Sequence, residues 1–326
     1  MTRKRHSAPT AALLCRSAAR RSSATPALLA RSRLAFGALC RFLGIALLAA
    51  CAGPALPEPY VVRDLRVIAL VVDPPEAAPG TTVRVTAWFY DPDGGGRPVV
   101  ATLYRCAKGG SADCLISPDA DNPTEILFSG TAQNVATDLH RFDVDVAIEA
   151  DALSGVGFLE QIYGLQRTFV VRGDNGERTI DGLKRLVITP PFGPKNKNPA
   201  FTGFMIEQEG RDLGDDRAVT RLARNDPYVL RPLFDSATLQ TYAVVDFNGE
   251  LLTFVEEASF TWSCSPDCTI DQRTTFDQDI VTIRPPLLGA ENDRFAIHVV
   301  MRDGRGGEAV LVRDFELGPE TLNFTQ

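Results

Sequence analysis

The sequence predicts an all-β fold of two tandem β-sandwich modules, placed after a cleavable leader and a short proline-rich spacer. Apolar and polar residues alternate from Val61 onward, and clusters of Asp, Pro and Gly interrupt the alternation. Alternation with a period of two indicates half-buried strands, and the clusters indicate turns. A segment that opens at Leu183 also resembles one that opens at Leu65, which indicates a repeated module.

The strand predictions rest on runs such as Val83, Val85, Ala87 and Phe89 in the first half, and Phe295, Ile297, Val299 and Met301 in the second. In each run the residues in between face the other way. They are Arg84, Thr86 and Trp88 in the first run and Ala296, His298 and Val300 in the second. The two similar segments read Leu65-Arg-Val-Ile-Ala-Leu-Val-Val-Asp-Pro-Pro and Leu183-Lys-Arg-Leu-Val-Ile-Thr-Pro-Pro. We therefore expect one sandwich over residues 61–172, a linker over 173–182, a second sandwich over 183–318 and a tail over 319–326.

The first 50 residues differ in charge from the rest of the chain. They hold nine Lys or Arg and no Asp or Glu, which leaves 25 basic and 41 acidic residues for the remainder. Arg41 precedes nine apolar or small residues that end at Ala50. A basic flank, a short apolar run and small residues are the layout of a secretory signal, and a membrane-spanning helix needs about 20 apolar residues. Residues 1–50 are therefore expected to be a leader.

Leu48, Ala49, Ala50 and Cys51 together resemble the lipobox of bacterial lipoproteins of the Gram-negative type. The resemblance implies a diacylglyceryl lipid on the Cys51 sulfur, cleavage before this residue, and acylation of the new amino terminus by a palmitate-like chain. Because Ala52 stands where the enteric version carries Asp for inner-membrane retention, the resemblance favours the outer membrane. An ordinary signal peptide cut after Ala52 is the alternative.

Residues 51–60 form the spacer, in which three prolines favour an extended chain of about 3.1 Å per residue. The acidic balance of the body argues against nucleic acid as a partner, because phosphate binding needs clustered basic residues.

Two further phrases resemble immunoglobulin-like modules of predicted bacterial surface lipoproteins. One is Asp73-Pro-Pro-Glu-Ala-Ala-Pro-Gly-Thr-Thr-Val-Arg-Val-Thr-Ala87, which resembles the opening of such a module. The other is Val299-Val-Met-Arg-Asp-Gly-Arg-Gly-Gly307, which resembles the last hairpin of such a module. The resemblance implies tandem immunoglobulin-like β-sandwiches. That fold hosts many unrelated functions, so it does not indicate an activity.

Four cysteines remain beyond Cys51, as two close pairs, Cys106 with Cys114 and Cys264 with Cys268. In an oxidising envelope such pairs predict two local disulfides. A four-thiolate zinc site and a redox couple are the alternatives, and the spacing and the lack of a nearby His argue against zinc.

Two acidic turns are weak candidates for calcium, the first with Asp91 and Asp93 and the second with Asp119 and Asp121. Neither matches the full EF-hand pattern, and Asp also favours turns by bonding its own backbone. No metal and no cofactor other than the lipid is expected.

The sequence shows no local catalytic signature. His298 falls on the outward side of its predicted strand, and His140 stands at the start of another. The adjacent acids Asp215-Asp216 and Glu256-Glu257 are typical of a solvated surface. Trp88, on the outward side of its strand, is the better candidate for stacking on a sugar, but the core is the commoner place for a Trp in a sandwich strand and is the expectation for both Trp88 and Trp262.

These observations predict a non-enzymatic protein of the cell envelope, held to the membrane by its lipid and serving a structural or binding (adhesion or display) role. Its partner would be an envelope protein or a glycan. A periplasm-facing subunit of a secretion or assembly complex and a carbohydrate-binding accessory lipoprotein are the alternatives. A solvent-exposed aromatic strip around Trp88 would favour the carbohydrate alternative.

Overall fold

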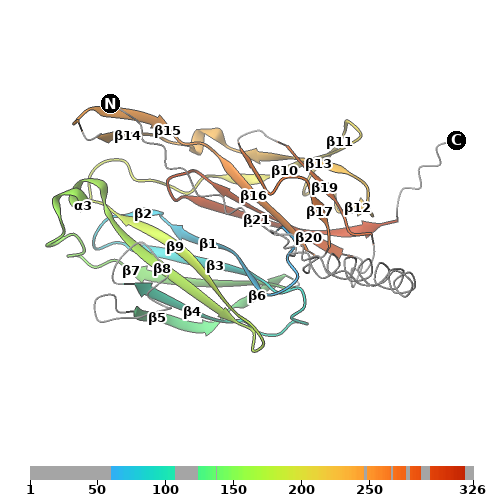
Figure 1. Ribbon diagram of the computed structural model, residues 1–326, viewed down its shortest axis with the longest axis horizontal. Helices are drawn as coiled ribbons and strands as arrows, with labels where there is room; N and C mark the ends of the chain where they lie inside the picture. The colour runs from blue at the N-terminus through green and yellow to red at the C-terminus, as the bar shows by residue number, and fades with distance from the viewer. Residues whose placement is uncertain are drawn as a thin grey trace, which may run out of the picture. The chain divides into compact units, whose positions relative to one another are not determined.

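The computed structural model describes residues 60–106, 124–136, 138–245, 248–265, 267–276, 280–287 and 294–319, all within one compact unit. These residues are mostly β-strand, so the prediction of an all-β fold is confirmed (Figure 1). Helix α3 (Phe158–Tyr163) and the 3-10 helix η1 (Ser236–Thr238) are short. Within the described ranges, no helix is long and apolar enough to cross a membrane.

The first sandwich consists of two sheets. One sheet has the order β1-β3-β7-β6, and the other has the order β2-β9-β8-β4-β5. Their bounds are β1 (Arg66–Asp73), β2 (Glu76–Ala77), β3 (Thr82–Tyr90), β4 (Val100–Cys106), β5 (Thr124–Thr131), β6 (Gln133–Ala136), β7 (Leu139–Ala147), β8 (Leu165–Asp174) and β9 (Thr179–Ile188). The alternating residues of β3, including Val85 and Phe89, are buried against Phe169 and Leu186 of the opposite sheet. The predicted alternation therefore builds this core.

The strand order of the first sandwich is that of an immunoglobulin-like fold. In that fold strands A, B, E and D form one sheet and C, F and G form the other. Here β1, β3, β7 and β6 occupy the first four positions, while β4, β8 and β9 occupy the last three. The chain crosses between the sheets after β1, and β2 then pairs in parallel with β9.

The second sandwich repeats this plan with two insertions, strand β11 at the edge of one sheet and the hairpin of β14 and β15. Its sheets have the orders β11-β10-β13-β19-β17 and β12-β21-β20-β16-β18, and a separate hairpin is formed by β14 and β15. The bounds are β10 (Phe201–Gln208), β11 (Arg211–Asp215), β12 (Arg221–Ala223), β13 (Tyr228–Phe234), β14 (Thr241–Val245), β15 (Leu251–Val255), β16 (Ser259–Ser265), β17 (Thr269–Ile270), β18 (Thr274–Phe276), β19 (Val281–Arg284), β20 (Arg294–Arg302) and β21 (Glu308–Gly318). As in the first sandwich, a short strand (β12) pairs in parallel with the last strand (β21).

Trp262 lies in the second core, as the sequence predicts. Its side chain is fully buried and meets Phe204 edge to face, with ring centroids 5.9 Å apart. Its indole N–H donates to Thr275 Oγ1 at 2.9 Å, so the one polar atom of the ring is satisfied.

The predicted boundary between the modules is wrong. Residues 173–182 are not a linker, because Asp174 pairs with Thr179 where the β8–β9 hairpin closes, and the pairing continues to Leu165 with Ile188. The segment that opens at Leu183 is therefore part of the last strand of the first sandwich, and the second sandwich begins at Phe201. The two segments that open at Leu65 and Leu183 are thus the first strand (β1) and the last strand (β9) of the same sandwich.

The outward faces of two sheets form an apolar interface between the sandwiches. Tyr90 and Leu139 of the first sandwich and Ala296 of the second are buried in one cluster, together with Val62. The chain enters the described part along the second sandwich, since Val62 N donates to Cys264 O at 2.8 Å and Cys264 N donates to Tyr60 O at 2.9 Å. The first residues of the predicted first module thus pair with β16 of the second.

Candidate functional site

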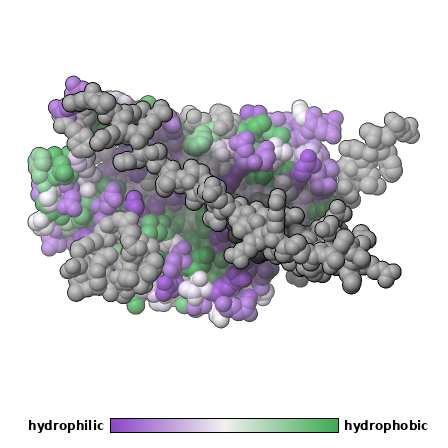
Figure 2. Space-filling model, in the orientation of Figure 1, coloured by the Kyte–Doolittle hydropathy of each residue, from purple (hydrophilic) through white to green (hydrophobic). Residues whose placement is uncertain are grey.

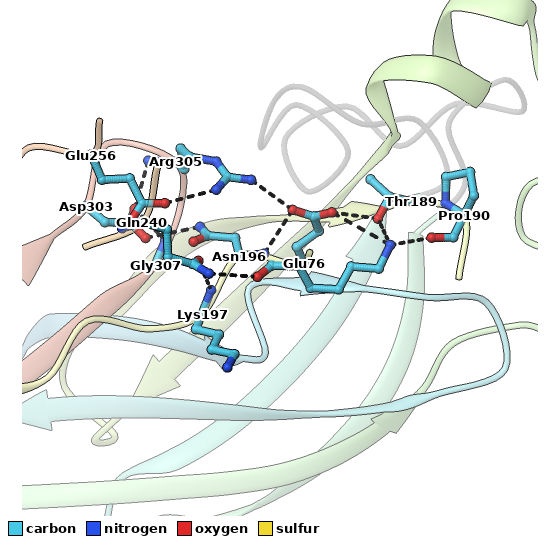
Figure 3. Close-up of polar contacts among 11 residues, drawn as sticks. Glu76, Thr189, Pro190, Asn196, Lys197, Gln240, Glu256, Asp303, Arg305 and Gly307 are labelled. Carbon is cyan, nitrogen blue, oxygen red and sulfur yellow. Dashed lines mark hydrogen bonds and ion pairs between the residues drawn. The ribbon is translucent and has the colours of Figure 1, made fainter. Parts of the chain in front are cut away.

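A network of buried and half-buried polar residues joins the two sandwiches at the connection between them, residues 189–200 (Figure 3). Its centre on the first sandwich is the Glu76 carboxylate of strand β2. Oε1 of this carboxylate accepts from Thr189 Oγ1 at 2.7 Å, and Oε2 accepts from the Asn196 backbone N–H at 3.1 Å. Lys195 Nζ lies 3.8 Å from Oε1 and also donates to Pro190 O. The connection is therefore held against the first sandwich along its length.

Arg305 links the two sandwiches directly. Its Nη2 donates to Glu76 Oε2 at 3.1 Å, and its Nη1 donates to Glu256 Oε1 at 3.0 Å. The Glu256 side chain is 0% exposed, and its other oxygen accepts from the Gln240 backbone N–H at 2.7 Å. Burial raises the pKa of the Glu256 carboxyl, and the bonds from Gln240 and Arg305 oppose that rise. One guanidinium thus satisfies a carboxylate on each side of the junction.

The turn between β20 and β21 fixes Arg305 in place. Oδ1 of the buried Asp303 carboxylate accepts from the backbone N–H groups of Arg305 and Gly307, at 2.7 and 2.9 Å. Oδ2 accepts from Asn196 Nδ2 at 3.0 Å. A Cβ at Gly307 would lie 2.9 Å from Lys197 O, so this close approach of backbone to backbone needs glycine.

A cleft of about 620 Å³ opens beside this network. Strand β14 supplies one wall, with Tyr242 and Val244, and helix α3 supplies another, with Ile162 and Tyr163. Glu76, Thr189 and Arg305 line it as polar groups. The Arg305 guanidinium lies over the Tyr242 ring, 4.4 Å from its centroid, so the polar network and the apolar wall are in direct contact.

The surroundings of the cleft expose large apolar side chains. On α3, Phe158 is 74% exposed, and Leu159, Ile162 and Tyr163 are also exposed. Figure 2 shows hydrophobic residues at the left edge of the molecule, where Figure 1 places α3. Exposed apolar residues gathered around a concave site are typical of binding surfaces.

The cleft lies at the end of the second sandwich opposite to the end where the chain enters. Tyr60 and Val62 bond to Cys264, near the end of β16, whereas the β14–β15 hairpin precedes its start at Ser259. Ser259 pairs with Arg302, which places the turn carrying Arg305 at that same start. Seven strand residues separate the two ends by about 20 Å.

The structure joins Cys264 to Cys268 by a disulfide, with Cα atoms 6.2 Å apart. Cys106 is buried at the end of β4 and is itself disulfide-bonded, and Cys114 lies outside the described residues. The lipobox residues Leu48, Ala49, Ala50 and Cys51 also lie outside them.

The first acidic turn is hydrogen-bonded to the turn between β8 and β9, which carries Asn175. The Asp91 carboxylate is buried, and its Oδ2 accepts from Asn175 Nδ2 at 2.8 Å. The neighbouring Asp93 carbonyl accepts from Arg97. Asp119 and Asp121 fall outside the part of the chain that the structure describes. In that part, no group of three or more His, Cys, Asp or Glu is placed to hold a metal ion.

His140 and His298, the two histidines among the described residues, are both buried. His298 points away from the core of its own sandwich, but Tyr90 of the first sandwich covers it, with ring centroids 4.3 Å apart. It is 1% exposed and has Ser263 Oγ at 3.4 Å from Nδ1. His140 lies in strand β7 and is 2% exposed.

Trp88 does not form an open aromatic strip. It is half-buried in the cluster between the sandwiches, and the Arg141 guanidinium lies over its ring, 5.2 Å from the centroid.

Each of the two acidic pairs has one buried member and one that is not buried, which corrects the expectation that both members are solvated. Asp215 and Glu257 are not buried, whereas Asp216 and Glu256 are. Asp216 bonds to Arg313 and accepts from the Phe204 N–H at 3.1 Å.

The sequence did not reveal Glu76, Gln240 and Arg305 as one group, since Glu76 and Arg305 are 229 residues apart along the chain. The β14–β15 hairpin does have a signal, the Asn248-Gly249 pair between two apolar runs.

No family model matches this chain, and no curated protein matches it. Among solved structures, it is similar to Salmonella alpha-2-macroglobulin reacted with methylamine, at 10% identity and a TM-score of 0.28 over 79% of this chain and 16% of that one. The N-terminal Ig1-2 module of the Drosophila receptor protein tyrosine phosphatase DLAR has 10% identity and a TM-score of 0.23, over 78% of this chain and 100% of that one. Spo0M from Bacillus subtilis has 12% identity and a TM-score of 0.25, over 78% and 91%. Similarity at this level carries no argument about function.

Proposed function

We propose that this chain is an exported lipoprotein, anchored through Cys51, that binds a protein partner in the cleft beside Arg305 and catalyses no reaction. The observation that carries the proposal is the position of the cleft. It lies at the end of the second sandwich opposite to Tyr60, where the chain from Cys51 enters. An anchor at Cys51 therefore leaves the cleft end free for a partner.

The rigidity of the junction supports a binding role. The apolar cluster around Tyr90 and Ala296 holds the sheets together, and the Arg305 bridge holds their connection. The junction therefore holds the Glu76 and Arg305 side of the cleft in place, and a preformed surface loses less conformational entropy when a partner binds.

The lining of the cleft favours a protein over a glycan. Its walls carry Ile162, Tyr163 and Val244, and its charged groups are one carboxylate and one guanidinium that pair with each other. A sugar-binding strip would instead need an open aromatic face, and Arg141 occupies the face of Trp88. A protein segment with apolar side chains matches these walls.

The carboxylates of the cleft support the non-enzymatic part of the proposal. Both oxygens of Glu76 accept hydrogen bonds, and so do both oxygens of Glu256. Arg305 lies between the two groups. A general acid or base needs a free path to a substrate proton, and these groups are committed to the junction.

Photocrosslinking in cells tests this proposal. A photoreactive amino acid in place of Tyr163, in the cleft wall, is expected to give a discrete adduct with another envelope protein. The same amino acid in place of Ile126, which is 64% exposed on edge strand β5, is the control and is expected to give none. Equal adducts at both positions, or none at Tyr163, would contradict binding in the cleft.

The location of the adduct also separates adhesion or display from the periplasm-facing alternative. Proteolysis of intact cells is expected to remove the crosslinked complex if the protein is displayed at the surface. Protection from the protease would favour a subunit of a secretion or assembly complex.

A further inference from the structure

The β14–β15 hairpin is a sheet of only two strands. Thr241–Val245 pairs with Leu251–Val255, and no third strand joins them among the described residues. An isolated two-stranded hairpin is marginally stable in water, and stable sheets add a third strand or a covering layer. All five residues of β15 are exposed, including Leu251 at 69% and Val255 at 65%.

Strand β15 has the composition of a strand that is covered on both faces. Its sequence Leu251-Leu-Thr-Phe-Val255 has no charge, no Pro and no Gly, and apolar residues stand on both of its faces. Strands that face water on one side normally alternate with polar residues. Native edge strands are usually protected by charges, Pro or bulges, and β15 has none of these between its ends.

We propose that β15 pairs with β15 of a second copy of this chain, antiparallel and centred on Thr253. The strand is symmetric in character about that residue. Centring on Thr253 places Thr opposite Thr, Leu252 opposite Phe254 of the second copy, and Leu251 opposite its Val255. Thr pairs and aromatic–aliphatic pairs are favourable cross-strand neighbours.

The symmetry of the strand favours a second copy over a foreign strand. A two-fold axis makes the same patch meet itself, so one self-matching strand suffices. It also joins two hairpins into a four-stranded sheet in the order β14-β15-β15-β14, which closes the assembly at two copies. Strand β14, which lines the cleft together with Thr253 of β15, stays at the outer edge of that sheet.

The surroundings of β15 set the strength of this dimer. Five residues a side bury less than the roughly 800 Å² per partner of a standard interface, so the dimer is weak in solution. Glu250 and Glu257 flank the strand with negative charge at both ends. Salt screens repulsion between like charges, so added salt strengthens the dimer, whereas it would weaken pairing with a basic partner.

Cysteine crosslinking tests the register. In the chain from residue 51 onward, with Cys51→Ser, Thr253→Cys places two thiols opposite each other at the two-fold axis, within reach of a disulfide. Under oxidation it is expected to give a covalent dimer. The matched control is Thr241→Cys on β14, which lies on the same face of the hairpin because Thr241 pairs with Val255. This control is expected to stay monomeric.

Sedimentation of the same chain tests the association itself. We expect a reversible monomer–dimer equilibrium that salt strengthens, and at least about a tenfold weaker dimer, about 1.4 kcal/mol, in Thr253→Lys. Thr241→Lys is expected to behave as the parent chain. A parent chain that stays monomeric at all concentrations, as it would if β15 took a foreign strand, would overturn the proposal. Assemblies larger than dimers, or crosslinking at residue 241 equal to that at 253, would also overturn it.

Discussion

Arg305→Ala is expected to lower the free energy of unfolding by about 3–5 kcal/mol, because it leaves the buried Glu256 carboxylate without its charged partner. The same change removes one of the donors to Glu76 and so loosens the junction between the sandwiches. Chemical denaturation, followed by the fluorescence of Trp88 and Trp262, measures the loss. Two separate unfolding steps in the variant would be a further sign that Arg305 couples the sandwiches.

Two variants control this measurement. Arg84→Ala breaks the bidentate pair with Asp145, in which both side chains are 56% exposed, and is expected to leave the midpoint nearly unchanged. Adding Glu256→Gln to Arg305→Ala removes the buried charge and is expected to restore part of the loss.

The Arg305→Ala variant is also expected to regain stability as the pH falls, since a carboxyl whose pKa is raised in the fold gains its proton on folding. An Arg305→Ala protein as stable as Arg84→Ala would refute a bridge of this importance.

His298 is expected to make the protein less stable as the pH falls below about 6.5. Burial, and to a lesser extent the charge of Arg66, lower the pKa of His298 to about 3, although a hydrogen bond that its ring donates to the Ser263 backbone opposes this. The unfolded chain therefore takes up a proton that the folded chain excludes, and the stability present above pH 6.5 is lost towards pH 3 at up to about 1.4 kcal/mol per pH unit.

The comparison of wild type with His298→Gln isolates this contribution. Other groups add a pH dependence of their own, since burial raises the pKa of Asp314 and lowers that of His140. These groups are present in both proteins, so the difference between the two curves belongs to His298. We expect the variant to lose less stability between pH 6.5 and 4.5, by about 2–3 kcal/mol. Parallel curves would show that His298 is accessible to protons in the folded protein.

The individual strands could be predicted from the sequence, and their assignment to modules could not. Val85 and Phe89 alternate with polar residues because a sandwich buries one face of each strand, and this pattern is local. The membership of β9 depends on its pairing with β8 across a hairpin, and Leu183–Ile188 has the same apolar character as an opening strand. Pattern alone does not distinguish a last strand from a first one.

The same limit applies to the site. Alternation correctly predicts that Trp88 and His298 point out of their own sandwiches, but the other sandwich covers both faces. The Arg305 bridge joins a turn near the end of the chain to strand β2 near its start. Such a contact arises from the packing of complete modules, and no spacing in the sequence encodes it.

The lipid on Cys51 is the claim on which the location and orientation of this protein depend. Metabolic labelling with a palmitate analogue, in wild type and in Cys51→Ser, tests it most directly. We expect label in the wild-type protein, recovered with the membrane fraction, and no label in Cys51→Ser. Wild-type protein that carries no label, or a Cys51→Ser protein labelled as strongly as wild type, would contradict the anchor.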